Sequence, residues 1–242
     1  MKQRTFLTAE WKNLVMLNYA VDPRLLQKFV PRGTELDFFQ GRTYASLIGF
    51  EFNRTCIAGA PVPFHQSFEE VNLRFYVRRQ DRRGVVFIRE LVPKYTVAVI
   101  ARFAFGENYS CVPMSHSIRM QAQSKIVEAE FTFGSGGSRC SMRIETAGGL
   151  SFYPEDGSLA QFITEHSWGY AVQKDGACME YEVQHPQWPV WGVKSAEFRG
   201  DASAYYGAEL ARILTYPADS AFLAEGSPVT VFKGSRIQNT HP

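Results

Sequence analysis

The stretch that decides the fold is EVNLRFYVR, residues 70–78. Apolar and polar residues alternate along it without a break, and successive side chains of a β-strand point to opposite faces. One face would carry Val71, Leu73, Phe75 and Val77, and the other Glu70, Asn72, Arg74, Tyr76 and Arg78. The alternation therefore predicts a strand with one apolar face and one polar face.

The polar face of this strand has two interpretations. In an open sheet it faces water and is an ordinary solvated surface. In a sheet that closes into a barrel, the same face lines the interior, and its members form a polar pocket. Buried charges persist when they are paired and hydrogen-bonded, so Arg74 would pair with Glu70 or bind a substrate carboxylate through its guanidinium.

Strand patterns dominate the rest of the chain. Further strands are expected at residues 13–19, 42–52, 85–91, 117–133, 139–146, 167–173, 179–184, 190–198 and 227–233. Helices are expected at residues 23–30, 93–106, 158–165 and 201–214. The strands follow one another mostly as antiparallel hairpins. The sequence therefore predicts an α+β chain of mostly antiparallel β-structure, a curved sheet or barrel with peripheral helices. No linker or repeat divides residues 1–242, so a single domain is expected.

Composition sets the broad class. The chain has 242 residues, is 45% hydrophobic and carries a formal net charge of +2, so it can bury a core but lacks the basic excess of a nucleic-acid-binding protein. Its apolar runs are too short to span a membrane, and no apolar stretch follows the charged N-terminus as in a secretory signal. The four cysteines are widely spaced. A cytoplasmic protein without nucleic-acid or membrane partners is expected, and a homodimer on the general frequency of dimers.

The known catalytic and metal motifs are absent. The histidines have no metal-ligand spacing, and the Gly-x-Ser-x-Gly, phosphate-loop and dinucleotide patterns do not occur. No metal and no cofactor are therefore expected. Ser115 and His116 are neighbours on an expected strand and face opposite ways, which argues against a Ser–His couple. His185 and Trp188 lie at a Pro-rich turn, either as a packed structural corner or as part of a binding site.

The segment RELVPK, residues 89–94, is a second candidate cluster. Arg89 and Glu90 point to opposite faces of their strand, so at most one of them can share a barrel interior. Lys94 falls in the first turn of the helix that Pro93 opens, where the helix dipole disfavours a cation and would lower the amine pKa. The alternative for Lys94 is a surface lysine whose amine reaches water.

Six segments together resemble a known family. They are residues 65–78 (HQSFEEVNLRFYVR), 84–94 (GVVFIRELVPK), 106–116 (GENYSCVPMSH), 162–170 (FITEHSWGY), 185–188 (HPQW) and 222–227 (FLAEGS). In this order they resemble the YqjF-like family of uncharacterised conserved bacterial proteins, from residue 6 to about residue 232. That family is placed in the acetoacetate-decarboxylase-like superfamily. The resemblance implies a closed or partly closed antiparallel β-barrel or cone with flanking helices.

The superfamily also implies a chemistry. Its decarboxylases carry an aromatic-Pro-Lys-Lys segment after Arg-Glu-Leu, and the first lysine forms a Schiff base with a β-keto acid. Pro93 and Lys94 are similar to that pair, but Tyr95 stands where the second lysine would be. An alignment anchored on the next strand instead brings the catalytic position to residues 110–112, which contain no lysine.

Two functions remain open. The first is a barrel that binds a small organic acid or carbonyl compound and acts on it as a lyase, as the resemblance implies. The second is a non-catalytic binding or sensing protein on the same barrel, which loss of the lysine pair favours. The candidate catalytic residues are Lys94 and Glu70. The candidate substrate-binding residues are Arg74, Asn72, Tyr76, Arg89, His116, His185 and Trp188.

Overall fold

A computed structural model describes residues 4–63 and 65–237, and the first three residues of the charged N-terminus lie outside these ranges. The main strands are β1 (Thr5–Val21), β3 (Thr43–Ile57), β5 (Phe68–Arg79), β6 (Arg82–Val92), β8 (Met114–Met120), β9 (Val127–Phe133), β10 (Cys140–Thr146), β11 (Trp168–Val172), β12 (Cys178–Gln184), β13 (Val190–Arg199) and β14 (Ser220–Phe232). Short strands are β2 (Glu35–Leu36), β4 (Ala60–Pro61), β7 (Tyr109–Cys111) and β15 (Ser235–Arg236). The helices are α1 (Pro23–Gln27), α2 (Tyr95–Phe105), α3 (Leu159–Thr164), α4 (Ser203–Tyr206) and α5 (Ala208–Leu214). Mostly β-structure with few helices is the class that the sequence predicts.

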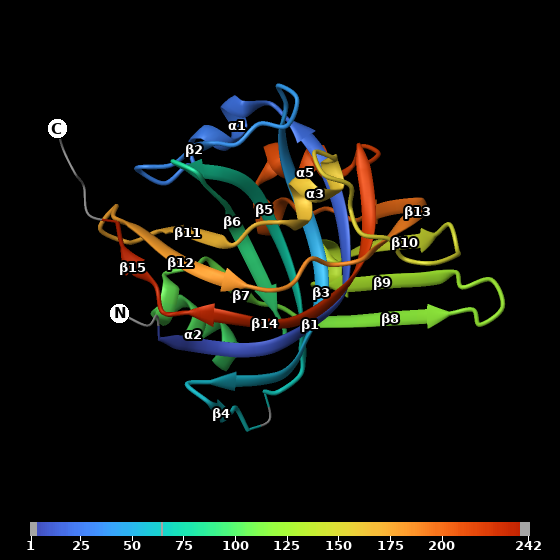
Figure 1. Cartoon of the computed structure of the whole chain (residues 1–242), viewed down its shortest axis with the longest axis horizontal. Helices are drawn as coiled ribbons and strands as arrows, with labels where there is room; N and C mark the ends of the chain where they lie inside the picture. The colour runs from blue at the N-terminus through green and yellow to red at the C-terminus, as the bar shows by residue number, and fades with distance from the viewer. Residues whose placement is uncertain (1–3, 64, 238–242) are drawn as a thin grey trace.

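Seven strands form a ring. The pairing order β12-β11-β6-β5-β3-β1-β14 returns to its start because β12 also pairs with β14, through Val183↔Val231 and Gln184↔Thr230. These strands surround a common interior (Figure 1). The long β1 and β3 contribute most of the pairing on one side, and α3 lies beside the upper part of the ring. Polar side chains on the inner faces of these strands can therefore meet although they are far apart in sequence.

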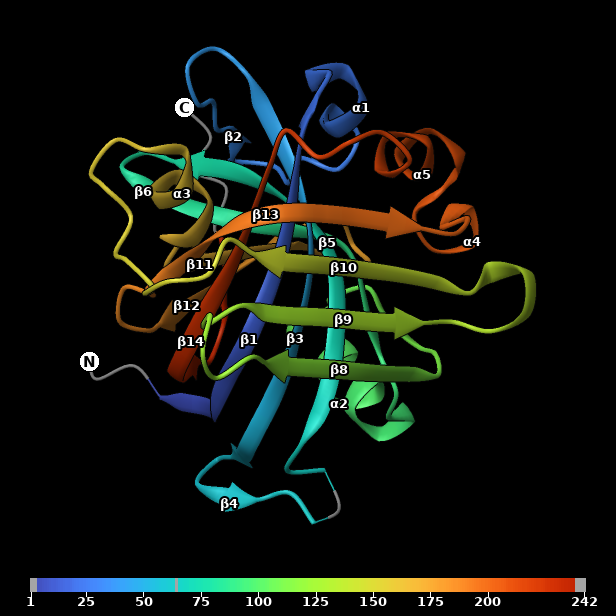
Figure 2. The same ribbon diagram turned by 90° about the vertical axis from the view of Figure 1, so that its right-hand side faces the viewer.

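A second group of strands continues the sheet beyond β14. In the order β13-β10-β9-β8, it runs across the outer side of β1, β3 and β5, as Figure 2 shows. Phe131, Phe133 and Met142 from β9 and β10 pack there in the largest apolar core, and all three are buried. Gly49 of β3 permits this close approach, because a Cβ at that position would lie 2.9 Å from the Phe131 ring. Gly49 thus marks a place where two layers of β-structure are in contact.

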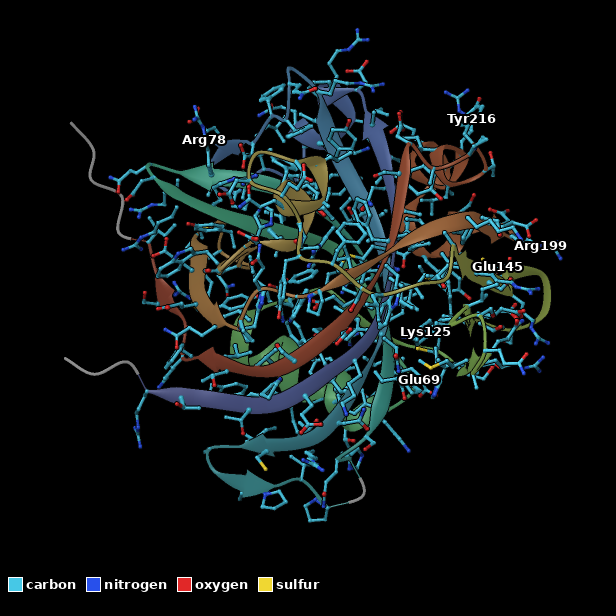
Figure 3. The ribbon with its side chains drawn as sticks, turned by 45° about the vertical axis from the view of Figure 1, so that its right-hand side comes forward. Glu69, Arg78, Lys125, Glu145, Arg199 and Tyr216 are labelled. Carbon is cyan, nitrogen blue, oxygen red and sulfur yellow. The ribbon has the colours of Figure 1, made fainter. Side chains whose placement is uncertain are left out.

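Strand β5 is buried on both faces. Its alternation is as predicted: Val71, Leu73, Phe75 and Val77 all belong to the core between the ring and the second group of strands. Glu70, Asn72, Arg74 and Tyr76 point the other way and are also buried, between 1% and 8% exposed. Figure 3 labels Glu69 and Arg78 near the two ends of β5, where the strand reaches the surface. The polar face therefore does not form a solvated surface along its central part.

The helix boundaries follow their capping residues. Asp22 accepts a hydrogen bond from the Arg24 backbone N–H and Pro23 is the first residue of α1, which ends at Gln27 and is shorter than expected. Gly106 ends α2 in the left-handed conformation at φ 73°. Ser158 caps α3 through the Gln161 backbone N–H. In these three helices, Asp, Pro, Ser and Gly at the ends are thus reliable local signals of where a helix begins or ends.

Besides α1, several elements differ from the sequence-based expectation, among them β1, which begins at Thr5 and not near residue 13. The strand expected at residues 117–133 is divided into β8 and β9, because a turn at 121–126 folds the chain back. The helix expected at 201–214 is divided into α4 and α5 at Gly207, whose φ of 78° breaks the helical path. The last strand, β14, begins seven residues before the expected position 227. Among the described residues, none of the helices has the length and apolar character needed to cross a membrane.

Candidate functional site

A cavity lies inside the ring of strands. Every one of the seven ring strands contributes to its wall, for example Trp11 from β1, Asn72 from β5 and Val231 from β14. The cavity has about 100 Å³ of room for the centres of water molecules. The loops and helices at the ring's ends add further lining residues, among them His166 after α3 and Trp188 after β12. An enclosed space with a few converging polar groups is the usual form of a small-molecule site.

Strand β5 supplies the polar floor of this cavity. Glu70, Asn72 and Arg74 line it in succession, and the Asn72 Nδ2 donates a hydrogen bond of 2.9 Å to the Glu70 Oε1. Tyr76 comes next on the same face and is 1% exposed, but it lies beside the cavity lining, where its hydroxyl contacts the Ser46 Oγ at 2.6 Å. Of the five residues that the alternation groups on this face, the structure thus places three in the cavity lining, Tyr76 beside them and Arg78 at the surface, where it pairs with Glu35.

A β-bulge in β6 decides which charge faces the cavity. Arg74 pairs with Phe87 but the preceding Leu73 pairs with Arg89, so Ile88 is an extra residue on the β6 side. The bulge reverses the alternation after Phe87, and Glu90 rather than Arg89 becomes the cavity-lining residue. The Ile88 carbonyl accepts a hydrogen bond of 3.0 Å from the Asn108 side chain. Arg89 does not line the cavity and lies on the opposite face of β6, across from Leu73.

The crossover from β6 through α2 to β7 brings two more polar residues beside Glu90. Strand β7 runs parallel to β6 and pairs Tyr109 with Glu90. The Tyr109 hydroxyl donates a hydrogen bond of 3.1 Å to the Glu70 Oε2. Glu107 follows the Gly106 cap of α2 and accepts a hydrogen bond of 2.8 Å from the Tyr181 hydroxyl. Three carboxyl groups and two phenols therefore meet at one end of the cavity.

Burial shifts the pKa values of all three carboxyl groups upward. Loss of water raises the pKa of Glu70 to about 7, although the hydrogen bonds from Asn72 and Tyr109 and the charge of Arg74 oppose the shift. Loss of water and the neighbouring Glu70 raise the pKa of Glu107 to about 8. The pKa of Glu90 is raised well above its usual value, by burial first and then by the charges of Glu107 and Glu70. Near neutral pH, these carboxyl groups are therefore protonated to a larger extent than exposed glutamates are.

The other end of the β5 floor carries cationic and imidazole groups. Arg74 is 8% exposed, and its Nη2 donates to the Ile163 carbonyl at the end of α3 at 3.0 Å. His166 stacks on Tyr76 with ring centroids 4.7 Å apart. Burial and the nearby Arg74 and Arg83 hold the pKa of His166 well below its usual value, so the imidazole is neutral. Arg74 is the single lysine or arginine in the described lining of the cavity.

Several buried polar atoms in the cavity wall are unsatisfied. Within residues 4–63 and 65–237, no hydrogen-bond partner of good geometry reaches the Asn72 Oδ1, the Arg74 Nε, the Glu90 Oε2 or either ring nitrogen of His166. The Ile163 backbone lies close enough to His166 to raise its pKa slightly, against the larger lowering effects. Buried polar atoms ordinarily have hydrogen-bond partners. A group of buried polar atoms without such partners around one cavity is typical of a binding site.

The His185–Trp188 corner also reaches the cavity. Both side chains line it, and their rings stack with centroids 4.0 Å apart and planes 15° from parallel. The Trp188 Nε1 donates to the Ser227 Oγ at 2.8 Å, and the His185 Nδ1 lies 2.8 Å from the Pro186 carbonyl oxygen. His185 and Trp188 therefore form a packed structural corner and also part of the cavity wall, so the two interpretations of this turn are compatible.

Besides Arg89, two further sequence-based candidates lie away from the cavity. Lys94 is the N-cap residue of α2 and does not contribute to the cavity lining. His116 lies on β8, on the outer side of the sheet, where its ring is 3.1 Å from a Glu51 oxygen and 2.9 Å from a Glu69 oxygen. Glu69 follows the alternation of β5 and therefore points away from Glu70, toward β8. The structure does not bring either candidate to the polar floor.

Sequence reasoning missed Glu107, Tyr109, His166 and Tyr181. Glu107 and His166 follow helix ends and Tyr109 lies on a short strand, whereas Tyr181 lies within β12, a strand that the sequence does predict. For Glu107 and Tyr109, the sequence did contain one signal, the Gly106 cap of α2. A helix that ends at such a cap is followed by a change of chain direction, which here leads back toward the sheet. Gly169 is a second signal: a Cβ there would collide with the Tyr181 ring, so the glycine allows that phenol to reach Glu107. Within the described ranges, no group of three metal-ligating side chains could hold a metal ion.

Comparison with protein families gives one match over most of the chain. Residues 8–228 match the model of the DUF2071 family, described as an uncharacterized conserved protein. The chain belongs to this family. A segment of 96 residues is 29% identical to the uncharacterized protein YqjF of Bacillus subtilis (strain 168). That segment covers 39% of this chain and 39% of YqjF. The family resemblance read from the sequence is thereby confirmed.

Solved structures share the fold of this DUF2071 chain. The enduracididine biosynthesis enzyme MppR in complex with pyruvate is 13% identical, with a TM-score of 0.70 over 100% of this chain and 93% of MppR. Acetoacetate decarboxylase from Legionella pneumophila is 12% identical, with a TM-score of 0.69 over 96% of this chain and 87% of that enzyme. An acetoacetate-decarboxylase-like enzyme from Sphingomonas wittichii RW1 is 13% identical, with a TM-score of 0.65 over 96% and 93%. The fold is therefore acetoacetate-decarboxylase-like.

Proposed function

We propose that the cavity binds a small organic acid or carbonyl compound and that its buried carboxyl groups exchange protons with that compound in a lyase-type reaction. The observation that carries the proposal is the meeting of Glu70, Glu90 and Glu107 with Arg74 around one enclosed space. Arg74 supplies positive charge with an unpaired Nε, and a carboxylate is the planar partner that a guanidinium binds best. A ligand carboxylate at Arg74 would place the rest of the molecule along β5, toward Glu70.

The carboxyl groups have the properties of general acids and bases. An efficient proton carrier has a pKa near the working pH, and the pKa values of Glu70 and Glu107 are about 7 and about 8. Tyr109 contacts Glu70, and it also lies close enough to Glu90 to affect the pKa of that carboxyl. We propose that the Tyr109 phenol relays a proton between Glu70 and Glu90. Glu70, the carboxyl nearest Arg74 on β5, is the group proposed to add or remove a proton next to the ligand's carbonyl.

The proposed chemistry does not need an imine. No lysine belongs to the described lining, and Lys94 lies at the N-terminus of α2. Borohydride reduction in the presence of pyruvate tests this point, because it converts an imine into a stable amine. We expect no increase in protein mass. A pyruvyl adduct on Lys94 would show that the reaction passes through that amine.

Ligand binding is tested by calorimetric titration with pyruvate at pH 6.5, and pyruvate is chosen because MppR, with the same fold, has been solved with it. Substitution Arg74→Gln is expected to weaken binding by about 30-fold or more, since it removes one partner of a buried charge pair. Arg78→Gln is the matched control, because Arg78 lies on the same strand but pairs with Glu35 at the surface. Equal weakening by both substitutions would contradict the role of Arg74.

A non-catalytic binding protein is the second candidate. It is favoured by the absence of a lysine from the described cavity lining, since the same carboxyl groups could simply hold a ligand. Deuterium exchange into the methyl group of pyruvate, followed by NMR in heavy water, separates the two. Catalysed exchange that Glu70→Gln abolishes supports the enzyme. Binding without exchange, for pyruvate and a panel of keto acids, supports the binding protein.

A further inference from the structure

Aromatic rings line the cavity beside the carboxyl end of the polar floor, because Phe50 of β3 pairs directly with Glu70 of β5. Trp11 of β1 packs edge-on against Phe50 and Phe52 of β3, with ring centroids 5.3 Å and 5.7 Å apart. Trp188 lies 6.1 Å from Trp11, and all four rings line the cavity. Trp168 from β11 lines it as well. A small hydrophilic acid such as pyruvate would leave this aromatic surface in contact with water, and an apolar ligand body would cover it.

The aromatic rings and the arginine share one cavity. Arg74 and His185 both line it, and burial first and then the charge of Arg74 lower the pKa of His185. His185 stacks on Trp188 at 4.0 Å, and the Trp188 ring lies 6.1 Å from the Trp11 ring. A ligand whose carboxylate lies at Arg74 can therefore contact aromatic rings on the side of His185 and Trp188 or along β5, where Phe50 lies beside Glu70.

The cavity is large enough for an organic ligand. Its room of about 100 Å³ for the centres of water molecules is several times the roughly 10–15 Å³ that a cavity needs to hold one water. The unsatisfied Arg74 Nε and His166 ring nitrogens lie at the end where an acid would place its polar group.

We propose that the natural ligand is a monocarboxylic acid with a ring-sized hydrocarbon body, whose carboxylate contacts Arg74 and whose body packs against Trp11, Trp188 and the phenylalanines of β3. This rests on the proposed function, because it takes an acid at Arg74 as given, and it narrows the substrate class. Short keto acids are then weak analogues that occupy the polar part of the cavity alone.

The test compares benzoate, pyruvate and benzamide as ligands of the unmodified protein, by calorimetry and by tryptophan fluorescence. Each additional buried methylene-sized group contributes about fourfold in affinity. Benzoate is therefore expected to bind at least tenfold more tightly than pyruvate. Benzamide, which has the ring but no charge, is expected to bind at least tenfold more weakly than benzoate. Three of the four tryptophans line the cavity, so benzoate should also change the emission.

Two substitutions locate the ring. Trp11→Leu is expected to remove the preference for benzoate while pyruvate affinity changes by no more than about threefold, because the carboxylate contact is intact. Trp191→Leu is the matched control, since Trp191 of β13 is absent from the described cavity lining and packs against the outer core. Loss of the preference in both variants would place the ring elsewhere and contradict the proposal.

The outcomes separate this inference from the proposed function. If pyruvate binds in an Arg74-dependent manner and benzoate binds no more tightly, the aromatic rings do not select the ligand and the inference is wrong, while the proposed function stands. If benzamide binds as tightly as benzoate, the carboxylate is not recognised and the inference is also wrong. If no acid of any size binds, both proposals fail together.

Discussion

The two faces of β5 are built from the same nine-residue stretch and have opposite roles. The apolar face belongs to the largest apolar core, which also contains residues of β9 and β10, and Phe75 is fully buried there. The polar face is equally hidden from water but borders a cavity in which several polar atoms lack partners. Burial alone therefore does not distinguish core from site in this protein. The difference lies in whether the buried groups are fully satisfied by their neighbours.

The largest expected effect comes from the apolar face. Phe75→Ala removes a side chain that is 0% exposed and neighbours the Phe29 ring, and it leaves a cavity in the largest apolar core. The free energy of unfolding is expected to fall by about 3–5 kcal/mol. Urea denaturation monitored by circular dichroism measures it. A loss below about 1 kcal/mol would mean that this core is not tightly packed.

The next effect is a pH dependence from the polar face. The pKa of Glu107 is raised from 4.5 to about 8 in the folded protein, so the folded state binds more protons than the unfolded state between these values. Its contribution is therefore fully stabilising below pH 4.5 and is lost as the pH rises toward 8. Relative to the unmodified protein, Glu107→Gln is expected to gain about 2–4 kcal/mol of stability between pH 5 and pH 8.

That gain is measured by urea denaturation of both proteins at the two pH values. Glu182→Gln serves as the control, because Glu182 lies on the same strand as Tyr181 but its side chain is hydrogen-bonded to Gln184 instead of to the cavity groups. An identical pH dependence in the unmodified protein and Glu107→Gln would show that Glu107 is not held in its neutral form.

A smaller effect is expected at Asn72. Asn72→Ala removes the donor that Glu70 accepts at 2.9 Å, so unfolding should become easier by about 1–2 kcal/mol. Because that hydrogen bond lowers the pKa of Glu70, its loss should raise the pKa above about 7. Isotope-edited infrared or NMR titration of the Glu70 carboxyl measures the shift. A pKa that falls in the variant would contradict the assigned role of Asn72.

The smallest effect is expected on the outer side of the sheet. His116→Gln removes the contacts with Glu51 and Glu69, which are partly exposed to solvent. The cost should be about 0–1 kcal/mol, and ligand affinity should be unchanged. Denaturation and pyruvate titration check both expectations. A large loss of affinity would show that the cavity is coupled to this outer cluster.

Much of the fold was readable from local patterns. The alternation of residues 70–78 predicted both faces of β5, and Asp22, Ser158 and Gly106 marked helix ends that the structure confirms. The division of the expected strand into β8 and β9 could not be predicted from the sequence, because the turn at residues 121–126 contains no Gly, Pro, Asn or Asp. At Gly207 a single glycine within a helical pattern was not enough to predict a break.

The site shows the same division. The sequence by itself determined that Glu70, Asn72 and Arg74 share a face, since that follows from the period of a strand. Only the tertiary structure decided that Glu90 joins them and Arg89 does not. That choice depends on one extra residue at Ile88, whose carbonyl is satisfied by Asn108 from a distant loop. A bulge is stabilised by contacts across the fold rather than by its own residue type, so no local pattern records it.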